Sequence, residues 1–255
     1  MKNIFKSVLL ILFLTISCNE DDSLGNVLNT NNYPYKQQVG YSASDILSNK
    51  NFTDIYIEVM YVDGFRPSAE TLTNLKNFIG SRTYKTNIVV EERLINISKK
   101  STYTIDDVRN IEDTNRGKFS IENQLVISAL FLNGKSSNDT ETTTILGTSY
   151  RNTSFVIFEE TIQAASNDIL GPSKIILEST VILHEFCHLL GLVNLGTSMV
   201  VNHEDAAHNA HCTTETCLMY YLIENGKNAP HWVKNEQIPQ LDTYCINDLK
   251  ANGGK

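Results

Sequence analysis

The pentapeptide His184-Glu185-Phe186-Cys187-His188 constrains this chain more than any other feature of its sequence. An apolar run that begins after Pro172 leads into it, and Gly191 follows it, so we expect a long helix over residues 173–190. Two histidines four residues apart lie on one face of a helix, where both imidazoles can reach one zinc ion. Glu185, beside the first histidine, is then placed to act as a general base toward water. The sequence therefore predicts a zinc site on this helix.

Two histidines do not complete a catalytic zinc site, which needs a third protein ligand and keeps a fourth position for water or substrate. Asn194, whose amide is a poor zinc ligand, follows Gly191 by three residues. The histidines downstream that could supply the third nitrogen are His203, His208, His211 and the more distant His231. The residue types alone leave that choice open.

The stretch from His211 to Met219 resembles the archaemetzincin family of zinc metallopeptidases. His211-Cys212, four further residues and Cys217-Leu218-Met219 reproduce its HCx4CxM pattern, and residues 184–191 match the HExxHxxG start of the wider metzincin signature. The resemblance implies that His211 is the third zinc ligand and that Met219 forms the Met-turn beneath the metal. It also implies an insertion of about 17 residues before His211, and a surface loop of that size costs little closure entropy.

The cysteines depart from the archaemetzincin pattern. That family carries a further CxxC after the methionine and binds a structural zinc, whereas this chain has only Cys245 there. In an oxidising exterior we therefore expect a local disulfide between Cys212 and Cys217, and a pairing of Cys187 with Cys245 stays open beside it.

Tyr221 follows Met219 by two residues, which resembles the arrangement in astacins and serralysins. There the tyrosine hydroxyl lies near the zinc and stabilises the oxyanion. The resemblance implies that role for Tyr221, while a core or rim tyrosine is the alternative.

Strands and helices alternate before the metal-binding motif, which indicates an α/β (α+β) domain. We expect strands over 55–62, 87–95 and 125–132, short strands over 144–150 and 154–159, and helices over 68–82 and 104–116. The metzincin resemblance implies a zincin fold with a twisted, mainly parallel sheet, a long active-site helix and a small C-terminal subdomain that contains the Met-turn. It also implies that 144–150 is an antiparallel edge strand, to which a peptide substrate could add.

The N-terminus is typical of an exported protein. Lys2 and Lys6 precede a short apolar run, and the sequence around Cys18 resembles a bacterial lipobox followed by the acidic export signal of Bacteroidetes-like surface lipoproteins. We expect a signal peptide over 1–17, a flexible tether over 18–50, and a metallopeptidase domain over 51–255, divided into upper (51–191) and lower (192–255) subdomains. The expected location is the bacterial cell envelope, as an outer-membrane lipoprotein facing outward through a lipid on Cys18.

The net charge of -8 argues against a nucleic-acid partner, which would favour a basic surface. We expect a monomeric zinc metalloendopeptidase that acts on a peptide or protein substrate. Two alternatives stay open: a zinc hydrolase with a narrow, non-general substrate, and a non-catalytic surface lipoprotein whose metal site is structural.

Overall fold

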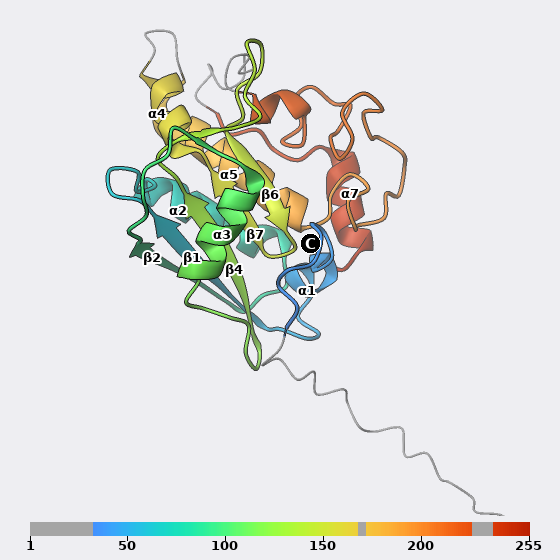
Figure 1. Ribbon diagram of the computed structural model, residues 1–255. Helices are drawn as coiled ribbons and strands as arrows, with labels where there is room; N and C mark the ends of the chain where they lie inside the picture. The colour runs from blue at the N-terminus through green and yellow to red at the C-terminus, as the bar shows by residue number, and fades with distance from the viewer. Residues whose placement is uncertain (1–32, 168–171, 226–236) are drawn as a thin grey trace, which may run out of the picture.

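A five-stranded sheet in the order β2–β1–β4–β7–β6 forms the centre of the molecule (Figure 1). The computed structural model describes residues 33–167, 172–225 and 237–255, so the predicted signal peptide, Cys18 and His231 lie outside the described residues. The strands of the sheet are β1 (Asp54–Tyr61), β2 (Asn87–Leu94), β4 (Gln124–Phe131), β6 (Gly147–Arg151) and β7 (Ser154–Ile157).

The sheet is mainly parallel, with one antiparallel strand at its edge. Strand β1 pairs in parallel with both β2 and β4, and β4 pairs in parallel with β7. Strand β6 runs antiparallel to β7 and forms the edge of the sheet that contacts the helix carrying His184 and His188. The predicted mixed sheet with an antiparallel edge strand is therefore confirmed. A separate two-stranded ribbon joins β3 (Thr102–Tyr103) to β5 (Lys135–Ser136).

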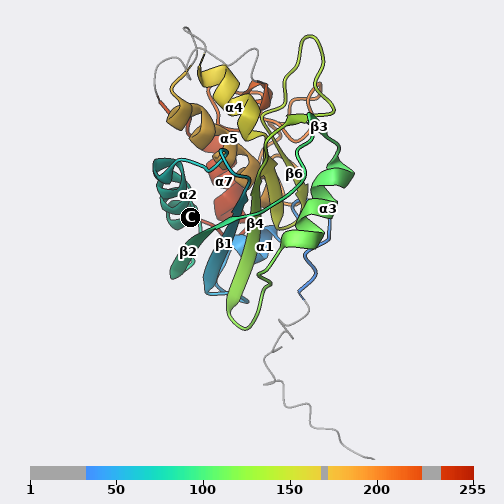
Figure 2. The same cartoon turned by 60° about the vertical axis from the view of Figure 1, so that its left-hand side comes forward.

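Helices cover both faces of the sheet (Figure 2). Helices α2 (Ala69–Arg82) and α5 (Lys174–Leu189) pack on one face, and α3 (Ile105–Asn115) lies over the other. Successive residues of a strand point to opposite faces, so Ile57 belongs to the core under α2 and α5 whereas Met60 belongs to the core under α3.

Local sequence signals set the helix ends. Thr104 and Asp107 form a capping box at the start of α3, each side chain bonding the other residue's backbone N–H. Helix α5 ends where Gly191 adopts a φ of +72°, and a Cβ there would lie 2.7 Å from the backbone nitrogen of Thr197. Only glycine fits that position, which explains why the helix stops so soon after His188.

Residues 33–50 are part of the fold, so the predicted tether over 18–50 is wrong in its second half. Helix α1 (Ala43–Leu47) buries Ile46 and Leu47 completely. The Nζ of Lys85 donates to the carbonyl oxygens of Asp45, Ser48 and Phe52 and so satisfies the end of this helix. The segment is rich in polar residues, so its sequence does not indicate a short helix with a buried apolar side.

The C-terminal part of the chain holds more helix than its weak periodicity predicts. It contains the 3-10 helix η2 (Tyr221–Glu224) and helix α7 (Thr243–Ala251), which buries Cys245 and Leu249. Another unpredicted helix, α4 (Glu159–Ser166), follows β7 directly. Across the described ranges, none of the helices has the length and apolar content needed to cross a membrane.

Candidate metal centre

Helix α5 places the two histidines of the pentapeptide one turn apart. Both His184 and His188 are buried, and their Nε2 atoms lie 3.1 Å apart. The ring planes are nearly perpendicular, at 87°, with centroids 4.8 Å apart. Both nitrogens therefore converge on one point beside the helix, as the predicted spacing requires.

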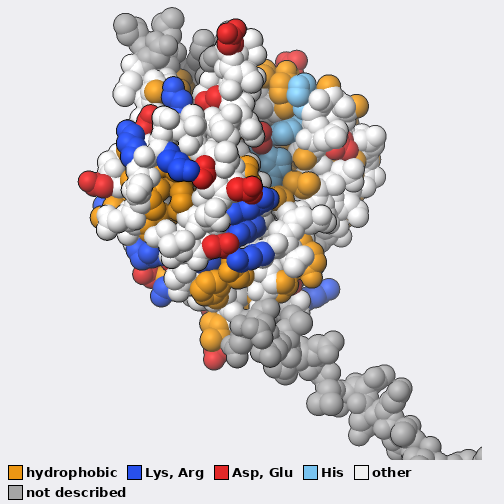
Figure 3. Space-filling model, viewed as in Figure 1, with side chains coloured by type: hydrophobic (Ala, Val, Ile, Leu, Met, Phe, Trp, Pro, Cys, Tyr) orange, Lys and Arg blue, Asp and Glu red, His pale blue; other side chains and the backbone are white. Residues whose placement is uncertain are grey.

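The structure brings His211, rather than His203 or His208, to this pair. The His211 ring lies 5.3 Å from the His184 ring and 5.2 Å from the His188 ring, centroid to centroid. The loop between Gly191 and His211 returns to the end of α5 and delivers the third imidazole. Histidine side chains line a groove between the sheet and the C-terminal loops (Figure 3).

Two of these rings have their protonation pattern set by backbone carbonyls. The Nδ1–H of His184 donates to the carbonyl of Leu218 at 2.7 Å, and the Nδ1–H of His211 donates to the carbonyl of Asn209 at 3.0 Å. This arrangement aims each Nε2 at the shared point, as metal-ligating histidines require. The His211 Nε2 is buried and lies 3.3 Å from the Oε1 of Glu224.

Burial favours the neutral, metal-binding form of His188. It lowers the pKa of this ring to about 4, so the ring carries no proton on one nitrogen at neutral pH. The donor set, its burial and its convergence on one point therefore fit a zinc ion held by His184, His188 and His211.

Glu224 completes the cluster and is the functional residue that the sequence reasoning missed. Its Oε1 lies 3.1 Å from the Nε2 of His184, 3.0 Å from that of His188 and 3.3 Å from that of His211. Burial would raise its pKa, but the hydrogen bonds to the three histidines hold that pKa well below its ordinary value. Nothing in the sequence spacing points to Glu224, because η2 carries it to the site from outside the recognised motif.

Glu185 is completely buried next to the histidine cluster. The hydroxyl of Ser149 on β6 donates to its Oε2 at 3.0 Å, while its Oε1 has no partner among the described residues. Burial, followed by the charge of Glu224, raises the pKa of Glu185 well above its ordinary value. Gly147 allows this close packing, because a Cβ there would lie 2.8 Å from the Cγ of Glu185. The sheet edge thus holds the predicted general base in place.

Met219 and Tyr221 lie on the segment that leads from His211 to Glu224. Met219 is completely buried in a turn in which the N–H of Tyr220 donates to the carbonyl of Cys217 at 3.0 Å. The Tyr221 ring stacks on His208, with ring centroids 3.5 Å apart. His208 in turn bonds Asp205 through its Nδ1, at 2.7 Å, which leaves it outside the metal cluster. The oxyanion role of Tyr221 stays a prediction.

A second cluster gathers His203 with three cysteines. The expected Cys212–Cys217 disulfide is wrong, and Cys187 and Cys245 are not paired either. All four of these cysteines are free thiols. The Sγ atoms of Cys217 and Cys245 lie 3.7 Å apart, and the Nδ1 of His203 lies 3.3 Å from the Sγ of Cys212. Hydrogen bonds from the thiols of Cys217 and Cys245 lower the pKa of Cys212, which favours its thiolate. The Cys212 sulfur has the thiols of both Cys217 and Cys245 within hydrogen-bonding reach, so the cysteines form a cluster and not a pair.

Asp248 of α7 orients His203 in this second cluster. The Nε2–H of His203 donates to the Oδ2 of Asp248 at 2.8 Å, and both side chains are buried. Its Nδ1 faces the Sγ of Cys212, and the hydrogen bonds to Asp248 and Cys212 outweigh burial and raise the pKa of His203. A carboxylate behind a metal-binding histidine is the usual outer-shell arrangement.

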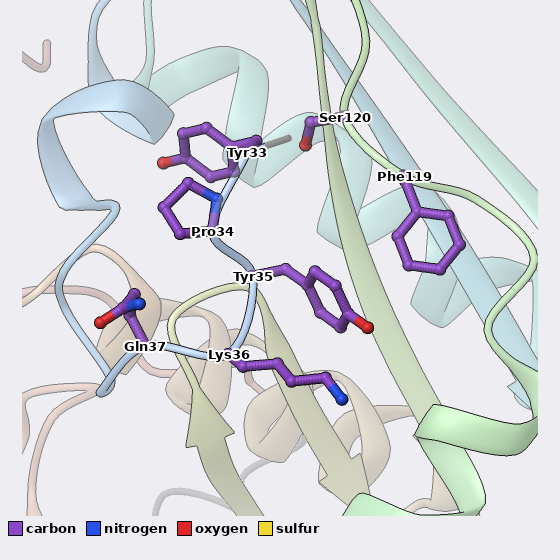
Figure 4. Close-up of a pocket in the computed structure, with 7 residues that line it drawn as sticks. All are labelled: Tyr33, Pro34, Tyr35, Lys36, Gln37, Phe119 and Ser120. Carbon is purple, nitrogen blue, oxygen red and sulfur yellow. The ribbon is translucent and has the colours of Figure 1, made fainter. Parts of the chain in front are cut away.

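A cavity of about 400 Å³ lies elsewhere, beneath the N-terminal segment (Figure 4). Tyr35 points toward Phe119 there, with the two rings edge to face at 5.2 Å. None of its lining residues belongs to either histidine cluster. The groove at the metal centre is therefore the better candidate for the chemistry.

The comparisons with known proteins agree with this fold. No protein-family profile matches the chain, and no curated protein sequence matches it. Among solved structures, the archaemetzincin from Methanopyrus kandleri matches 78% of this chain and 96% of its own, with a TM-score of 0.50 and 15% identity. The archaemetzincin from Archaeoglobus fulgidus, solved with malonate, matches 76% of this chain and 99% of its own, with a TM-score of 0.42 and 13% identity. The chain thus has the fold of an archaemetzincin.

Proposed function

We propose that this chain is a zinc-dependent metallopeptidase. The observation that carries the proposal is the convergence of three buried imidazole nitrogens beside Glu185, in a fold shared with an archaemetzincin. His184, His188 and His211 would hold the ion. When bound, zinc supplies a Lewis acid that polarises a carbonyl and lowers the pKa of water toward about 7.

Glu185 is the residue that moves protons in this proposal. Its unpartnered Oε1 is free to accept the proton of the attacking water, while Ser149 fixes the other carboxylate oxygen. Glu185 then returns that proton to the nitrogen of the leaving amine. Its burial keeps bulk water away from the reacting groups. Tyr221 is proposed to donate a hydrogen bond to the oxyanion after a rotation away from His208.

The substrate proposed is an extended peptide. Strand β6 is the edge of the sheet and packs beside α5, so its backbone lies along the side of the metal centre. A peptide that adds to this edge is held by main-chain hydrogen bonds, which do not depend on its sequence. An endopeptidase with broad side-chain tolerance is the expected result.

The test is cleavage of a mixed peptide library by the zinc-loaded full chain beside its Glu185→Ala variant, read by mass spectrometry. Cuts made by the parent and absent with the variant, at equal zinc content, support the proposal. A variant that cuts at the parent's rate would overturn the role of Glu185. A folded, zinc-bound parent that makes no cuts would favour a narrow-substrate hydrolase or a non-catalytic lipoprotein.

The second cluster is proposed to hold a structural zinc ion through four of its five donors, which are His203, Cys212, Cys217, Cys245 and Asp242. Tetrahedral zinc with bonds of about 2.3 Å to sulfur places two sulfurs roughly 3.8 Å apart, and the observed separation of Cys217 and Cys245 is 3.7 Å. Four protein donors leave no open position, which is typical of a structural site.

The location proposed is the bacterial cell envelope, through a lipid on Cys18. The support is the sequence of residues 1–22, with its short apolar run, its cysteine and its acidic residues. Metabolic labelling with a radioactive fatty acid tests it, with Cys18→Ala as the control. Equal labelling of both chains would exclude Cys18 as the anchor.

A further inference from the structure

The four donor atoms of the metal centre all lie within 4.8 Å of one another. Glu224 Oε1 lies 3.0–3.3 Å from each of the three imidazole Nε2 atoms. The Nε2 atoms of His184 and His188 are 3.1 Å apart. Four-coordinate zinc with bonds of about 2.0–2.2 Å to nitrogen and oxygen requires donors roughly 3.3–3.5 Å apart. The carboxylate oxygen is therefore close enough to all three nitrogens to share one ion with them.

A cation is needed to hold these atoms together. The Nδ1–H groups of His184 and His211 donate to carbonyl oxygens, so both rings turn their Nε2 atoms toward the Glu224 carboxylate. Lone pairs facing an anion at about 3 Å repel one another unless a proton or a metal ion lies between them. A divalent ion satisfies all four donors at once, whereas one proton satisfies a single pair.

The backbone around Glu224 also occupies the edge of the sheet. The N–H of Leu146 donates to the carbonyl of Glu224 at 3.0 Å. Ile145 and Asn225 form an antiparallel bridge, and the N–H of Thr144 donates to the Asn225 side chain at 3.2 Å. Residues 144–146 lead directly into β6. Residues 224–225 therefore take up backbone hydrogen bonds at this edge that an added peptide strand would otherwise form.

We propose that Glu224 is a fourth protein ligand of the metal ion and that residues 224–225 occupy the substrate cleft from within the chain. The proposal rests on the metallopeptidase function given above and adds its regulation. In this state the centre offers no position to water or substrate. Glu224 must leave the metal before a peptide can bind, and its side chain, 29% exposed, has a path toward solvent.

The experiment measures how easily a small anion reaches the metal. The full chain is loaded with Co(II), whose visible absorption reports its ligands, and is titrated with azide and with acetohydroxamate. The variants are Glu224→Gln, which keeps the size of the side chain, and Glu224→Ala. The matched control is Glu215→Gln, which removes one carboxylate from an exposed position of the same loop region.

Both Glu224 variants are expected to bind the two anions at least about tenfold more tightly than the parent and the control, because a competing ligand that fills the site reduces apparent affinity in proportion. They should also bind the metal more weakly. A Glu224→Gln chain that fails to retain Co(II), while Glu215→Gln retains it, supports the same ligand role. Equal anion affinity and equal metal affinity in all four chains would overturn the proposal.

Two readouts separate this proposal from the proposed function. If the Glu224 variants bind anions more tightly but no chain cleaves the peptide library, the result supports Glu224 as a ligand and contradicts the peptidase function. If parent and variants cleave the library at the same rate and bind anions equally, the result supports the peptidase function and contradicts Glu224 as a ligand. Water-proton relaxation of the Co(II)-loaded parent needs no variant, and a directly bound, exchanging water molecule in the resting chain would contradict a closed centre.

Discussion

Gly147 brings the sheet edge closer to Glu185 than a residue with a side chain would allow. A Cβ at this position would lie 2.8 Å from Glu185 Cγ and 2.9 Å from Val181 Cγ1. We expect Gly147→Ala to displace Glu185 and to lower kcat/KM about a hundredfold, the effect of a displacement of roughly 1 Å, with zinc content unchanged. Peptide hydrolysis and metal analysis of the same samples check this.

Gly80 provides the control for that substitution. A Cβ there would meet only the Cδ1 of Ile88, at 3.7 Å, and alanine suits the interior of α2 better than glycine does. Gly80→Ala should therefore retain full activity. Wild-type kinetics in Gly147→Ala would show that the contact with Glu185 does not position the general base.

His203 should account for one of two bound zinc ions. We expect His203→Ala to retain one zinc ion instead of two and to lower the melting temperature by at least about 5 °C, because structural zinc contributes directly to folding. His208→Ala is the matched control, since that ring stacks on Tyr221 outside both clusters. Metal analysis with calorimetry measures both effects, and an unchanged two-zinc content in His203→Ala would remove it from the ligand set.

For single residues, the sequence predicts the roles of those whose partners are close along the chain. The spacing of His184 and His188 follows from helix geometry, and the role of Gly191 follows from its conformational freedom. Glu224 and His203 reach their partners across loops whose path no local pattern defines. The sequence does not indicate the second cluster, because only one cysteine, Cys245, follows Met219 and the remaining nitrogen donor, His203, lies earlier in the chain.

At the scale of elements, α4 and α5 enclose a buried carboxylate. Glu159 is completely buried, and its Oε1 lies 2.8 Å from the Nζ of Lys174. Burial, and then the charge of Glu178, raise the pKa of Glu159 to about 8. The folded chain therefore holds a proton that the unfolded chain releases above about pH 4.3, and the stability from this group falls as pH rises from there to about 8.

Glu159→Gln should remove this pH dependence. Relative to the parent, the variant should gain on the order of 3 kcal/mol of unfolding free energy between pH 5 and pH 8. Urea unfolding at the two pH values measures the difference, and the exposed Glu70→Gln in α2 is the control. A difference between variant and parent that stays constant with pH would contradict a raised pKa for Glu159.

The elements that the sequence predicts are those with clear periodicity or caps. The three long strands and the helices α2, α3 and α5 follow their patterns closely. Helices α1 and α7 are short and have one buried side each. Their formation therefore depends on packing against the rest of the chain rather than on local helix preference.

At the scale of the whole molecule, the segment before α1 joins the sheet to the loop that carries His211. The buried side chain of Asn152 donates to the carbonyl of Pro34 and to the hydroxyl of Ser42, both at 2.7 Å. Gly40 packs directly against the backbone of Leu195 and Gly196, so a Cβ there would overlap the Leu195 carbonyl. The N-terminal segment therefore supports the insertion between Gly191 and His211.

This arrangement predicts different behaviour for two truncated chains. A chain of residues 33–255 should unfold cooperatively, whereas a chain of residues 51–255 should lose at least about 3–6 kcal/mol, because Ile46 and Leu47 each contribute roughly 1.5–3 kcal/mol through burial. The shorter chain should also bind zinc more weakly, since its His211 loop has lost its support. Denaturant unfolding followed by circular dichroism, with zinc titration, measures both effects. The double variant Ile46→Ala/Leu47→Ala should reproduce much of the loss, and the exposed Lys50→Ala should not. Equal unfolding midpoints for the two truncated chains would mean that the metallopeptidase domain begins at residue 51, as its sequence alone suggests, and that α1 is only an attachment.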